Sequence, residues 1–492
     1  MNTMNSLKKG VVAGFSFSII LISGCLDGSS SSNDVQAPAP APEPEREQQV
    51  RIDEGFFVVD EASLPFEALP SFSNTDRWWG VHQGAGYRVE VPDNWNGMLV
   101  MWTHGFRGEG PELTVDSPPI RTYLLEEGYA WAASSYSANY YDVRAGVEDT
   151  NALALAFNSI AEQNGRALPA PSKYYITGVS MGGHVAGAAV ERETLATANN
   201  VVEYAGAAPM CGVMGDTALF DYFTAYGLAL FEVAGVGATQ FPVSPEEAEE
   251  KLAIAKQELW FDYDTNPTPL GLTSQGEVFF QVLKNLSGGE RPIYPLSFGG
   301  FQDLLQGFLG TDGTITGITA ERAVDTTDIT YRFESDPGEP LTPAEQNFNA
   351  TIAQAEAVPG ANAQRDDGLR WIPAINGEFD VPVVTIHTLG DLFVPISMQQ
   401  IYRQRAEAAG SGDLLVQRAV RAPGHCDFSI EEFTETFDAM IQWEQRGIVP
   451  AGDDLLDPVA LADPQFGCEF TRDGFPEELT REPIRQLIGD CD

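Results

Sequence analysis

The stretch YYITGVSMGGHVAGAAVE, residues Tyr174–Glu191, places a single serine between two runs of different character. The run before Ser180 is aromatic and β-branched, as in a buried strand, and the run after it is rich in alanine, as in a helix. A chain that passes directly from strand to helix strains the corner residue and exposes its side chain above the sheet. Gly178 and Gly182 leave room for such a turn. The pattern predicts a strained corner at Ser180, and a plain glycine-rich connection is the alternative.

A serine hydroxyl becomes a strong nucleophile only when a base takes its proton and an acid orients that base. The chain has 5 histidines. His82 precedes the predicted sheet, and His387 lies inside a predicted strand. His104 starts a turn, and His184 follows the serine by about one helical turn. His425 lies in the loop RAPGHCDF after the last predicted strand, where its ring can reach the edge of the sheet, so we predict that His425 is the base.

Three aspartates compete for the role of the acid. Asp391, in HTLGDLFVP, directly follows an apolar strand and precedes His425 in the chain. Asp380 lies at the start of that strand, on the wrong side, and Asp427 is too close in sequence to hold the imidazole ring. We predict that Asp391 is the acid, with a simple turn aspartate as the alternative.

Attack by a serine on a carbonyl group creates an oxyanion, which needs two preorganised N–H donors. The backbone N–H of Met181, at the start of the predicted helix, can supply one of them. The loop His104-Gly105-Phe106 follows the apolar run MLVMWT and can supply the other. We predict Phe106 as the second donor, with Gly105 as the alternative.

Apolar strands alternate with helical stretches on both sides of the serine, which predicts an α/β fold with a mostly parallel sheet covered by helices on both faces. Residues 212–370 differ, because SPEEAEEKLAIAKQELWF and TPAEQNFNATIAQAEA have helical patterns and no strong buried strand interrupts them. We predict a large, mainly helical cap there, between core parts at 51–211 and 371–447. Residues 448–492 form a C-terminal extension.

These motifs resemble those of the α/β-hydrolase superfamily. The order Ser180, Asp391, His425 is the order in that family, and GVSMGGH, HTLGDLFVP and GHCDF look like secreted bacterial esterases and the catalytic domains of prolyl-oligopeptidase-like enzymes. The resemblance covers roughly residues 85–211 and 372–446. It implies a Ser-His-Asp triad and no cofactor. The long separation between Ser180 and Asp391 departs from a minimal member, and the predicted cap accounts for it.

The resemblance leaves three function classes open. The first is a serine-dependent hydrolase of apolar or aromatic carboxylic esters, polyester fragments included, which works through an acyl-enzyme on a small-molecule substrate. The second is a serine peptidase of the prolyl-oligopeptidase-like type, although no repeats of a β-propeller precede the motifs. The third is a non-catalytic surface binding protein with the same fold, which would be expected to lack a triad member. We favour the ester hydrolase.

The first residues have the pattern of an export signal. Residues 1–24 contain Lys8 and Lys9, then a short apolar run, and end before Cys25 in LISGC. This resembles a bacterial lipobox, and an ordinary secretory signal is the alternative. Residues 25–50, rich in serine and Ala-Pro, read as a tether. We predict a lipid-anchored protein of the bacterial cell envelope, on the outer membrane, that contacts the membrane only through lipidated Cys25.

The net charge of −43 argues against nucleic acid as a partner, because phosphates require a basic surface. DYDTN at Asp262–Asn266 imitates the start of a calcium loop. Pro267 and Thr273 stand where such a loop needs glycine and glutamate, so we predict no metal site. The oligomeric state is left open.

Four cysteines remain when Cys25 is set aside, and in an oxidising envelope an even set predicts two disulfides with three possible pairings. We predict Cys211–Cys426, because Cys211 follows a strand at its carboxyl end and Cys426 adjoins the predicted base. Cys468 and Cys491 then enclose a short terminal segment. Free buried thiols are the alternative.

Overall fold

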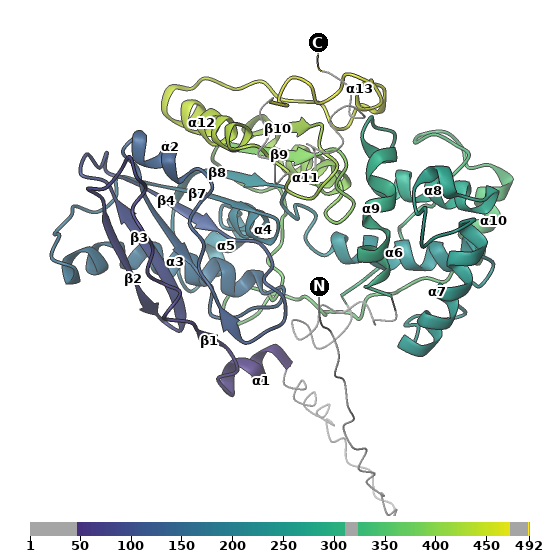
Figure 1. The fold of residues 1–492 in the computed structure, drawn as a ribbon, viewed down its shortest axis with the longest axis horizontal. Helices are drawn as coiled ribbons and strands as arrows, with labels where there is room; N and C mark the ends of the chain where they lie inside the picture. Colours follow the sequence, from purple (N-terminus) through teal and green to yellow (C-terminus); the bar gives the residue numbers. More distant parts are fainter. Residues whose placement is uncertain (1–46, 310–322, 473–490, 492) are drawn as a thin grey trace, which may run out of the picture. The chain divides into compact units, whose positions relative to one another are not determined.

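The computed structural model of the chain describes residues 47–309, 323–472 and 491. Its centre is an eight-stranded sheet with the order β10-β9-β8-β7-β4-β6-β3-β2 (Figure 1). The predicted signal, Cys25 and most of the predicted tether lie outside the described residues. Helix α1 begins at Glu47, and Gln48 is buried because its side-chain amide donates to Asn139 O and Asp142 Oδ2. The helix therefore starts four residues before the boundary expected at residue 51.

In the sheet order, the strands from β10 to β6 run parallel to one another, and β3 runs antiparallel to both of its neighbours, β6 and β2. A separate short parallel pair joins β1 and β5. The strands are β1 (Val58–Val59), β2 (Asp76–His82), β3 (Ala85–Val91), β4 (Met98–Thr103), β5 (Glu112–Leu113), β6 (Ala130–Ser134), β7 (Lys173–Val179), β8 (Tyr204–Met210), β9 (Val383–Thr388) and β10 (Leu415–Val420).

The prediction that the sheet begins after His82 is wrong, because His82 is the last residue of strand β2. This strand lies at the edge of the sheet, where only β3 pairs with it. Trp78 is buried, but Trp79 and Val81 are largely exposed. An edge strand with so few buried side chains lacks the apolar run that marks the inner strands.

Side chains alternate between the two faces of the sheet, as strand geometry requires. Leu99 and Met101 of β4 belong to one apolar cluster, and Val100 and Trp102 belong to the other. Helices α3 and α4 cover the first face, and α2 and α12 cover the second (Figure 1). Burial on both faces explains why the inner strands are continuously apolar.

The helices are α1 (Glu47–Asp53), α2 (Arg121–Glu126), α3 (Val143–Gln163), α4 (Met181–Ala188), α5 (Arg192–Thr197), α6 (Ala218–Val233), α7 (Pro245–Leu259), α8 (Ser274–Leu286), α9 (Tyr294–Gln306), α10 (Pro343–Thr351), α11 (Ser397–Ala409), α12 (Ile430–Arg446) and α13 (Pro458–Leu461), with 3-10 turns η1 (Pro269–Gly271) and η2 (Gly412–Leu414). Among the described helices, none combines the length and the apolarity that a membrane crossing needs.

Helices α6 to α10 lie between β8 and β9 in the chain, and we call residues 212–370 the inserted segment. Its described parts, 212–309 and 323–370, contribute no strand to the central sheet. Ser244, the first residue of the helical pattern SPEEAEEKLAIAKQELWF, caps α7 by accepting from Glu247 N. Helix α10 ends at Thr351, earlier than its helical sequence pattern.

The predicted fold class is confirmed by this topology. The parallel strands are joined through helices that cover both faces, and a serine lies at the turn from the central strand β7 into α4. This is the α/β-hydrolase fold. In such sheets ligands bind beyond the carboxyl ends of the strands, and Ser180, Asp391 and His425 each lie just after one of those ends.

Candidate active site

Ser180 lies at the corner between β7 and α4 with a φ of 57°, a conformation that a non-glycine residue adopts only under constraint. The two flanking glycines are required by close approach. A Cβ atom at Gly178 would overlap Thr103 and the carbonyl of Gly182, and one at Gly182 would overlap the carbonyl of Thr103. The turn therefore has the strained geometry expected from the sequence, and Ser180 is partly exposed at the end of β7.

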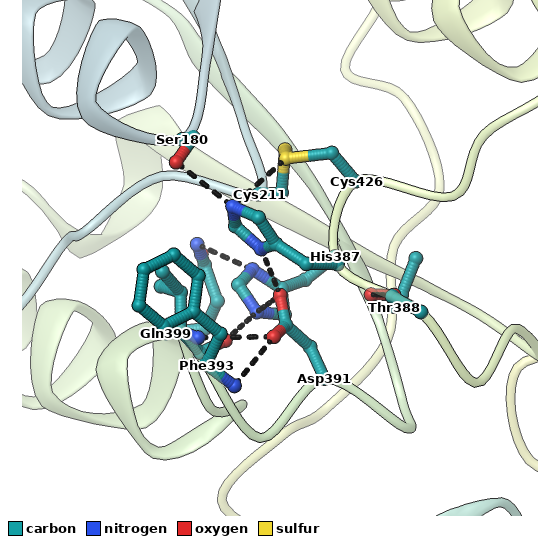
Figure 2. Close-up of a disulfide and its surroundings, with 11 residues drawn as sticks. Ser180, Cys211, His387, Thr388, Asp391, Phe393, Gln399 and Cys426 are labelled. Carbon is teal, nitrogen blue, oxygen red and sulfur yellow. Dashed lines mark hydrogen bonds and ion pairs between the residues drawn. A yellow bond between two sulfur atoms is a disulfide. The ribbon is translucent and has the colours of Figure 1, made fainter. Parts of the chain in front are cut away.

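The structure brings Ser180, His425 and Asp391 together from the ends of three different strands (Figure 2). His425 Nε2 lies 2.8 Å from Ser180 Oγ, and His425 Nδ1 lies 2.5 Å from Asp391 Oδ2. With Nδ1–H donated to the carboxylate, Nε2 is left to accept the proton of the serine hydroxyl. This geometry would allow the three side chains to act as the nucleophile, base and orienting acid predicted from the sequence.

The Asp391 carboxylate is fully buried, and its position is fixed by the turn that carries it. Its Oδ1 accepts hydrogen bonds from the backbone N–H groups of Phe393 and Val394, both at 2.9 Å. Its Oδ2 is thereby left to face the imidazole. Thr388, at the end of β9, donates its hydroxyl to Gly424 O at 2.7 Å, which joins this turn to the loop of His425.

A second histidine, His387, lies beneath the acid with its Nε2 at 3.8 Å from Asp391 Oδ2 (Figure 2). Burial lowers the pKa of His387, so its ring is neutral at neutral pH. Its Nε2–H donates to Val394 O at 2.7 Å, and its Nδ1 faces the side-chain amide of Gln399 at 3.3 Å. His387 therefore supports the backbone just after Asp391 without bringing a second charge to it.

The loop His104–Phe106 reaches the serine through Gly105, where an added Cβ atom would lie 3.2 Å from Ser180 Cβ. The His104 ring stacks on Tyr136 with centroids 4.0 Å apart, and the Tyr136 hydroxyl donates to His104 O at 3.0 Å. Burial lowers the pKa of His104 to about 4, so the ring is neutral and belongs to the support of this loop.

The other candidates lie elsewhere. The ring of His184 is buried between the Tyr141 hydroxyl at 2.9 Å and Pro373 O at 2.8 Å. Asp380 lies before β9, at the opposite end of that strand from Asp391, in an exposed ion pair with Arg192. Neither residue faces Ser180.

Two disulfides are present, and they are the two pairs expected from the sequence. Cys211 pairs with Cys426 across 215 positions of the chain, and Cys468 pairs with Cys491. The first disulfide adjoins the base, because Cys426 Sγ lies 3.4 Å from His425 Nε2 (Figure 2). It ties the loop of His425 to the end of strand β8.

Aromatic side chains lie beside the His425 ring. The Phe393 ring lies edge-on to His425 with centroids 5.2 Å apart. Phe223 and Phe308 of the inserted segment stack on each other at 4.4 Å and on Phe393 at 5.8 and 6.0 Å. We call these three residues the aromatic wall. The role of Phe393 was missed, although its place two residues after Asp391 is a usable signal.

The residues outside this constellation form a separate cavity but no metal-binding group within the described part of the chain. A cavity of about 580 Å³ is lined in part by Asp216, Arg370 and Arg405, and none of its lining residues belongs to the site. Within the described part of the chain, no group of three or more His, Cys, Asp or Glu side chains is placed to hold a metal ion. Asp262–Asn266 forms a turn in which Asn266 N donates to Asp262 O.

Comparison with known proteins yields distant likenesses. No family model matches the chain. The o-phthalyl amidase of Xanthobacter agilis is 31% identical over 87 residues, which cover 18% of this chain and 19% of the amidase. The chain thus matches less than a fifth of that relative's length.

Among solved structures, feruloyl esterase B from Aspergillus oryzae is similar with a TM-score of 0.44 and 15% identity, over 80% of this chain and 85% of that chain. An acylaminoacyl peptidase from Pyrococcus horikoshii gives a TM-score of 0.35 and 9% identity, over 78% of this chain and 44% of that chain. The fold assignment rests on the sheet order and the serine turn rather than on these likenesses.

Proposed function

We propose that the chain hydrolyses carboxylic esters through an acyl-enzyme formed on Ser180. The observation that supports this most directly is the continuous line of contacts from Ser180 Oγ to His425 at 2.8 Å and from His425 to Asp391 at 2.5 Å. Three further features support the proposal: Ser180 lies in a strained turn, the neutral His387 lies beside Asp391, and Gly105 brings its loop against Ser180.

In the first half of the reaction, His425 Nε2 takes the proton of Ser180 as Oγ attacks the ester carbonyl carbon. The carbonyl π electrons move to oxygen, and the N–H groups of Met181 and Phe106, or Gly105, are the proposed donors to this oxyanion. The imidazolium then protonates the leaving alkoxide oxygen as the C–O bond breaks, and Asp391 stabilises the imidazolium throughout. An acylated Ser180 and a free alcohol result.

In the second half, a water molecule takes the place of the alcohol. His425 removes a proton from the water, which attacks the acyl carbon, and the same N–H donors stabilise the second oxyanion. Ser180 Oγ leaves and recovers its proton from His425. The products are a carboxylic acid and the enzyme in its starting state, with no cofactor required.

The substrate range is tested by assaying the purified chain against p-nitrophenyl esters of graded chain length, aryl esters and aminoacyl anilides. We expect esters to be turned over at least about tenfold faster than anilides at the same leaving-group quality. Ser180→Ala should abolish both activities. Anilide turnover that exceeds ester turnover would instead establish amide hydrolysis, the second candidate function described next.

The second candidate is hydrolysis of aryl amides by the same residues. The local match to an o-phthalyl amidase favours it, since that relative is named for cleaving an amide. Both reactions pass through an acylated serine, and they differ in the leaving group, which must be protonated more fully when it is an amine. The ester hydrolase remains our first proposal.

The aromatic wall should select substrates by the apolar area that they bury. Each apolar square ångström buried contributes roughly 25 cal/mol, so an aryl group that covers Phe308 gains about 1–2 kcal/mol over acetate. We expect Phe308→Ala to lower kcat/KM for an aryl or long-chain ester by about tenfold and to leave p-nitrophenyl acetate within about twofold. If Phe308→Ala lowers kcat/KM for acetate and aryl esters by the same factor, the aromatic wall is purely structural.

The Cys211–Cys426 disulfide should matter more for turnover than for folding. Displacement of a reacting group by about 1 Å can cost about 10²-fold in rate, so freeing the His425 loop should lower kcat between about 10- and 100-fold in Cys211→Ser/Cys426→Ser. The control is Cys468→Ser/Cys491→Ser, which removes the other disulfide. Equal kcat values for the two double variants, measured below their melting temperatures, would contradict this prediction.

We also propose that the protein is exported and lipidated at Cys25, on the basis of the lipobox-like sequence. The expected mature amino terminus is a diacylglyceryl-modified Cys25 on the envelope of the host. Mass spectrometry of the amino-terminal peptide from host membranes tests this. An unmodified terminus at another residue would contradict it.

A further inference from the structure

We propose that Arg291 and Tyr222, two side chains of the inserted segment, are positioning residues that hold the turn of Asp391 in its productive geometry. This inference rests on the proposed function and assigns the inserted segment a part in the chemistry itself, in addition to any effect on substrate range. The acid turn is defined here as residues Leu389–Leu392.

The backbone groups of the acid turn are divided between the sheet and the inserted segment. On the sheet side, the N–H groups of Leu389 and Gly390 donate to Val420 O and Ala422 O, both at 2.9 Å. On the other side, its carbonyl groups accept from the inserted segment. Arg291 Nε donates to Leu389 O at 2.6 Å, and the Tyr222 hydroxyl donates to Leu392 O at 3.0 Å.

These two carbonyl groups lie on either side of the acid in the chain. Leu389 precedes Asp391 by two residues, and Leu392 follows it directly. Rotation of the peptide units at these points would move the carboxylate relative to His425. The inserted segment therefore holds the Leu389–Gly390 and Leu392–Phe393 peptide units, each of which is one unit removed from those of Asp391 itself. The second of these units also carries Phe393 N, which with Val394 N donates to the carboxylate.

The Arg291 side chain is an unusual group to find in this position, because it is only 1% exposed. Its Nη1 donates to Gly289 O at 2.8 Å, its Nη2 donates to Ser287 Oγ at 3.0 Å, and the guanidinium lies 4.9 Å from the Tyr294 ring centroid. Among the described residues, no carboxylate oxygen forms an ion pair with it. Burial lowers the pKa of Arg291 to about 10, so it still carries its charge at neutral pH.

A buried charge without a paired carboxylate is costly to retain, and a neutral apolar side chain would fill the same volume more cheaply. The Arg291 guanidinium donates to two backbone carbonyls and one hydroxyl. Two of these acceptors, Gly289 O and Ser287 Oγ, lie in the inserted segment, and the third, Leu389 O, lies in the acid turn. Ile293 packs in the same apolar cluster as Leu389, and Gly390 has no room for a side chain because Ser297 lies against it. Side chains from α6, from the α8–α9 connection and from α9 thus hold the acid turn in place.

The sharpest test uses two tyrosines that lie one helical turn apart on α6. Tyr222 and Tyr226 are both buried, but the Tyr222 hydroxyl reaches Leu392 O and the Tyr226 hydroxyl reaches Gln302 Oε1 at 2.9 Å. Tyr222→Phe and Tyr226→Phe each remove one buried hydroxyl. We expect Tyr222→Phe to lower kcat for p-nitrophenyl acetate by about tenfold with KM within about twofold. Tyr226→Phe should leave kcat within about twofold of the parent.

A double-mutant cycle separates positioning from a general loss of structure. If Tyr222 acts through the acid, Tyr222→Phe should lower kcat no further in an Asp391→Asn background. Arg291→Met is expected to behave in the same way, with a larger loss of kcat in the parent, of about 10- to 100-fold. Because Arg291→Met can impair folding, Tyr222→Phe carries the decision.

The outcomes distinguish this inference from the proposed function. If Ser180→Ala retains ester hydrolysis, both the proposed function and the positioning role of Arg291 and Tyr222 would be overturned. If hydrolysis depends on Ser180 but Tyr222→Phe and Tyr226→Phe have the same kcat, the positioning role of Arg291 and Tyr222 would be overturned and the proposed function would stand. Equal losses from Tyr222→Phe in the parent and in the Asp391→Asn background would also overturn it, since the effect would then not pass through the acid.

Discussion

Ser180→Ala should lower kcat for p-nitrophenyl acetate by about 10⁴-fold or more, with little change in KM. Removal of Oγ abolishes the acyl-enzyme, and what remains is the rate enhancement from binding and from the oxyanion donors. Alanine fits the corner, because Ser180 makes no side-chain cap to α4. The measurement is steady-state kinetics on protein whose melting temperature matches that of the parent.

The matched control is Ser159→Ala, on the exposed side of α3, where the hydroxyl donates only to Ala156 O. Its kcat should equal that of the parent. Residual turnover by Ser180→Ala within tenfold of the parent would show that the observed hydrolysis does not use the proposed nucleophile.

Asp391→Asn should lower kcat by about 10³- to 10⁴-fold, although the two side chains have almost the same shape. An asparagine amide can donate to His425 Nδ1, which would place the imidazole proton on Nε2, facing Ser180. In that tautomer the ring cannot accept the serine proton. The Phe393 and Val394 N–H groups favour the amide oxygen at the present Oδ1 position, which directs the amide nitrogen toward the histidine.

Asp380→Asn provides the comparison for a change of the same kind before the same strand. Asp380 is exposed and pairs with Arg192, so its loss should leave kcat within about twofold of the parent and should barely change stability, because solvent screens an exposed ion pair. Comparable kinetic losses in the two variants would remove Asp391 from the proposed mechanism.

The part of this architecture that is encoded locally could be predicted from the sequence. Gly178 and Gly182 mark the turn of Ser180 because only glycine tolerates the approach of Thr103 and the nearby carbonyl groups. Inner strands such as β9 are recognisable because burial on both faces makes them continuously apolar. The resemblance to a known superfamily added the order in which Ser180, Asp391 and His425 occur.

The part that depends on tertiary contacts could not be predicted. Arg291 occurs in GGERPIY, which gives no sign of burial, since two of its three acceptors are backbone carbonyls, which carry no sequence signal. Tyr222 looks like any other aromatic residue of α6, and only the folded chain shows that its hydroxyl meets Leu392 O. The edge strand β2 could not be recognised in the sequence because too few of its side chains are buried, and Trp79 and Val81 are exposed.

The most direct test of the central claim is mass spectrometry of the intact chain after reaction with a fluorophosphonate, followed by peptide mapping. If Ser180 is the nucleophile, we expect a single phosphonyl adduct on the peptide that contains Ser180, formed by the parent and absent from Ser180→Ala. An adduct on a different residue, or one that persists unchanged in Ser180→Ala, would contradict the account.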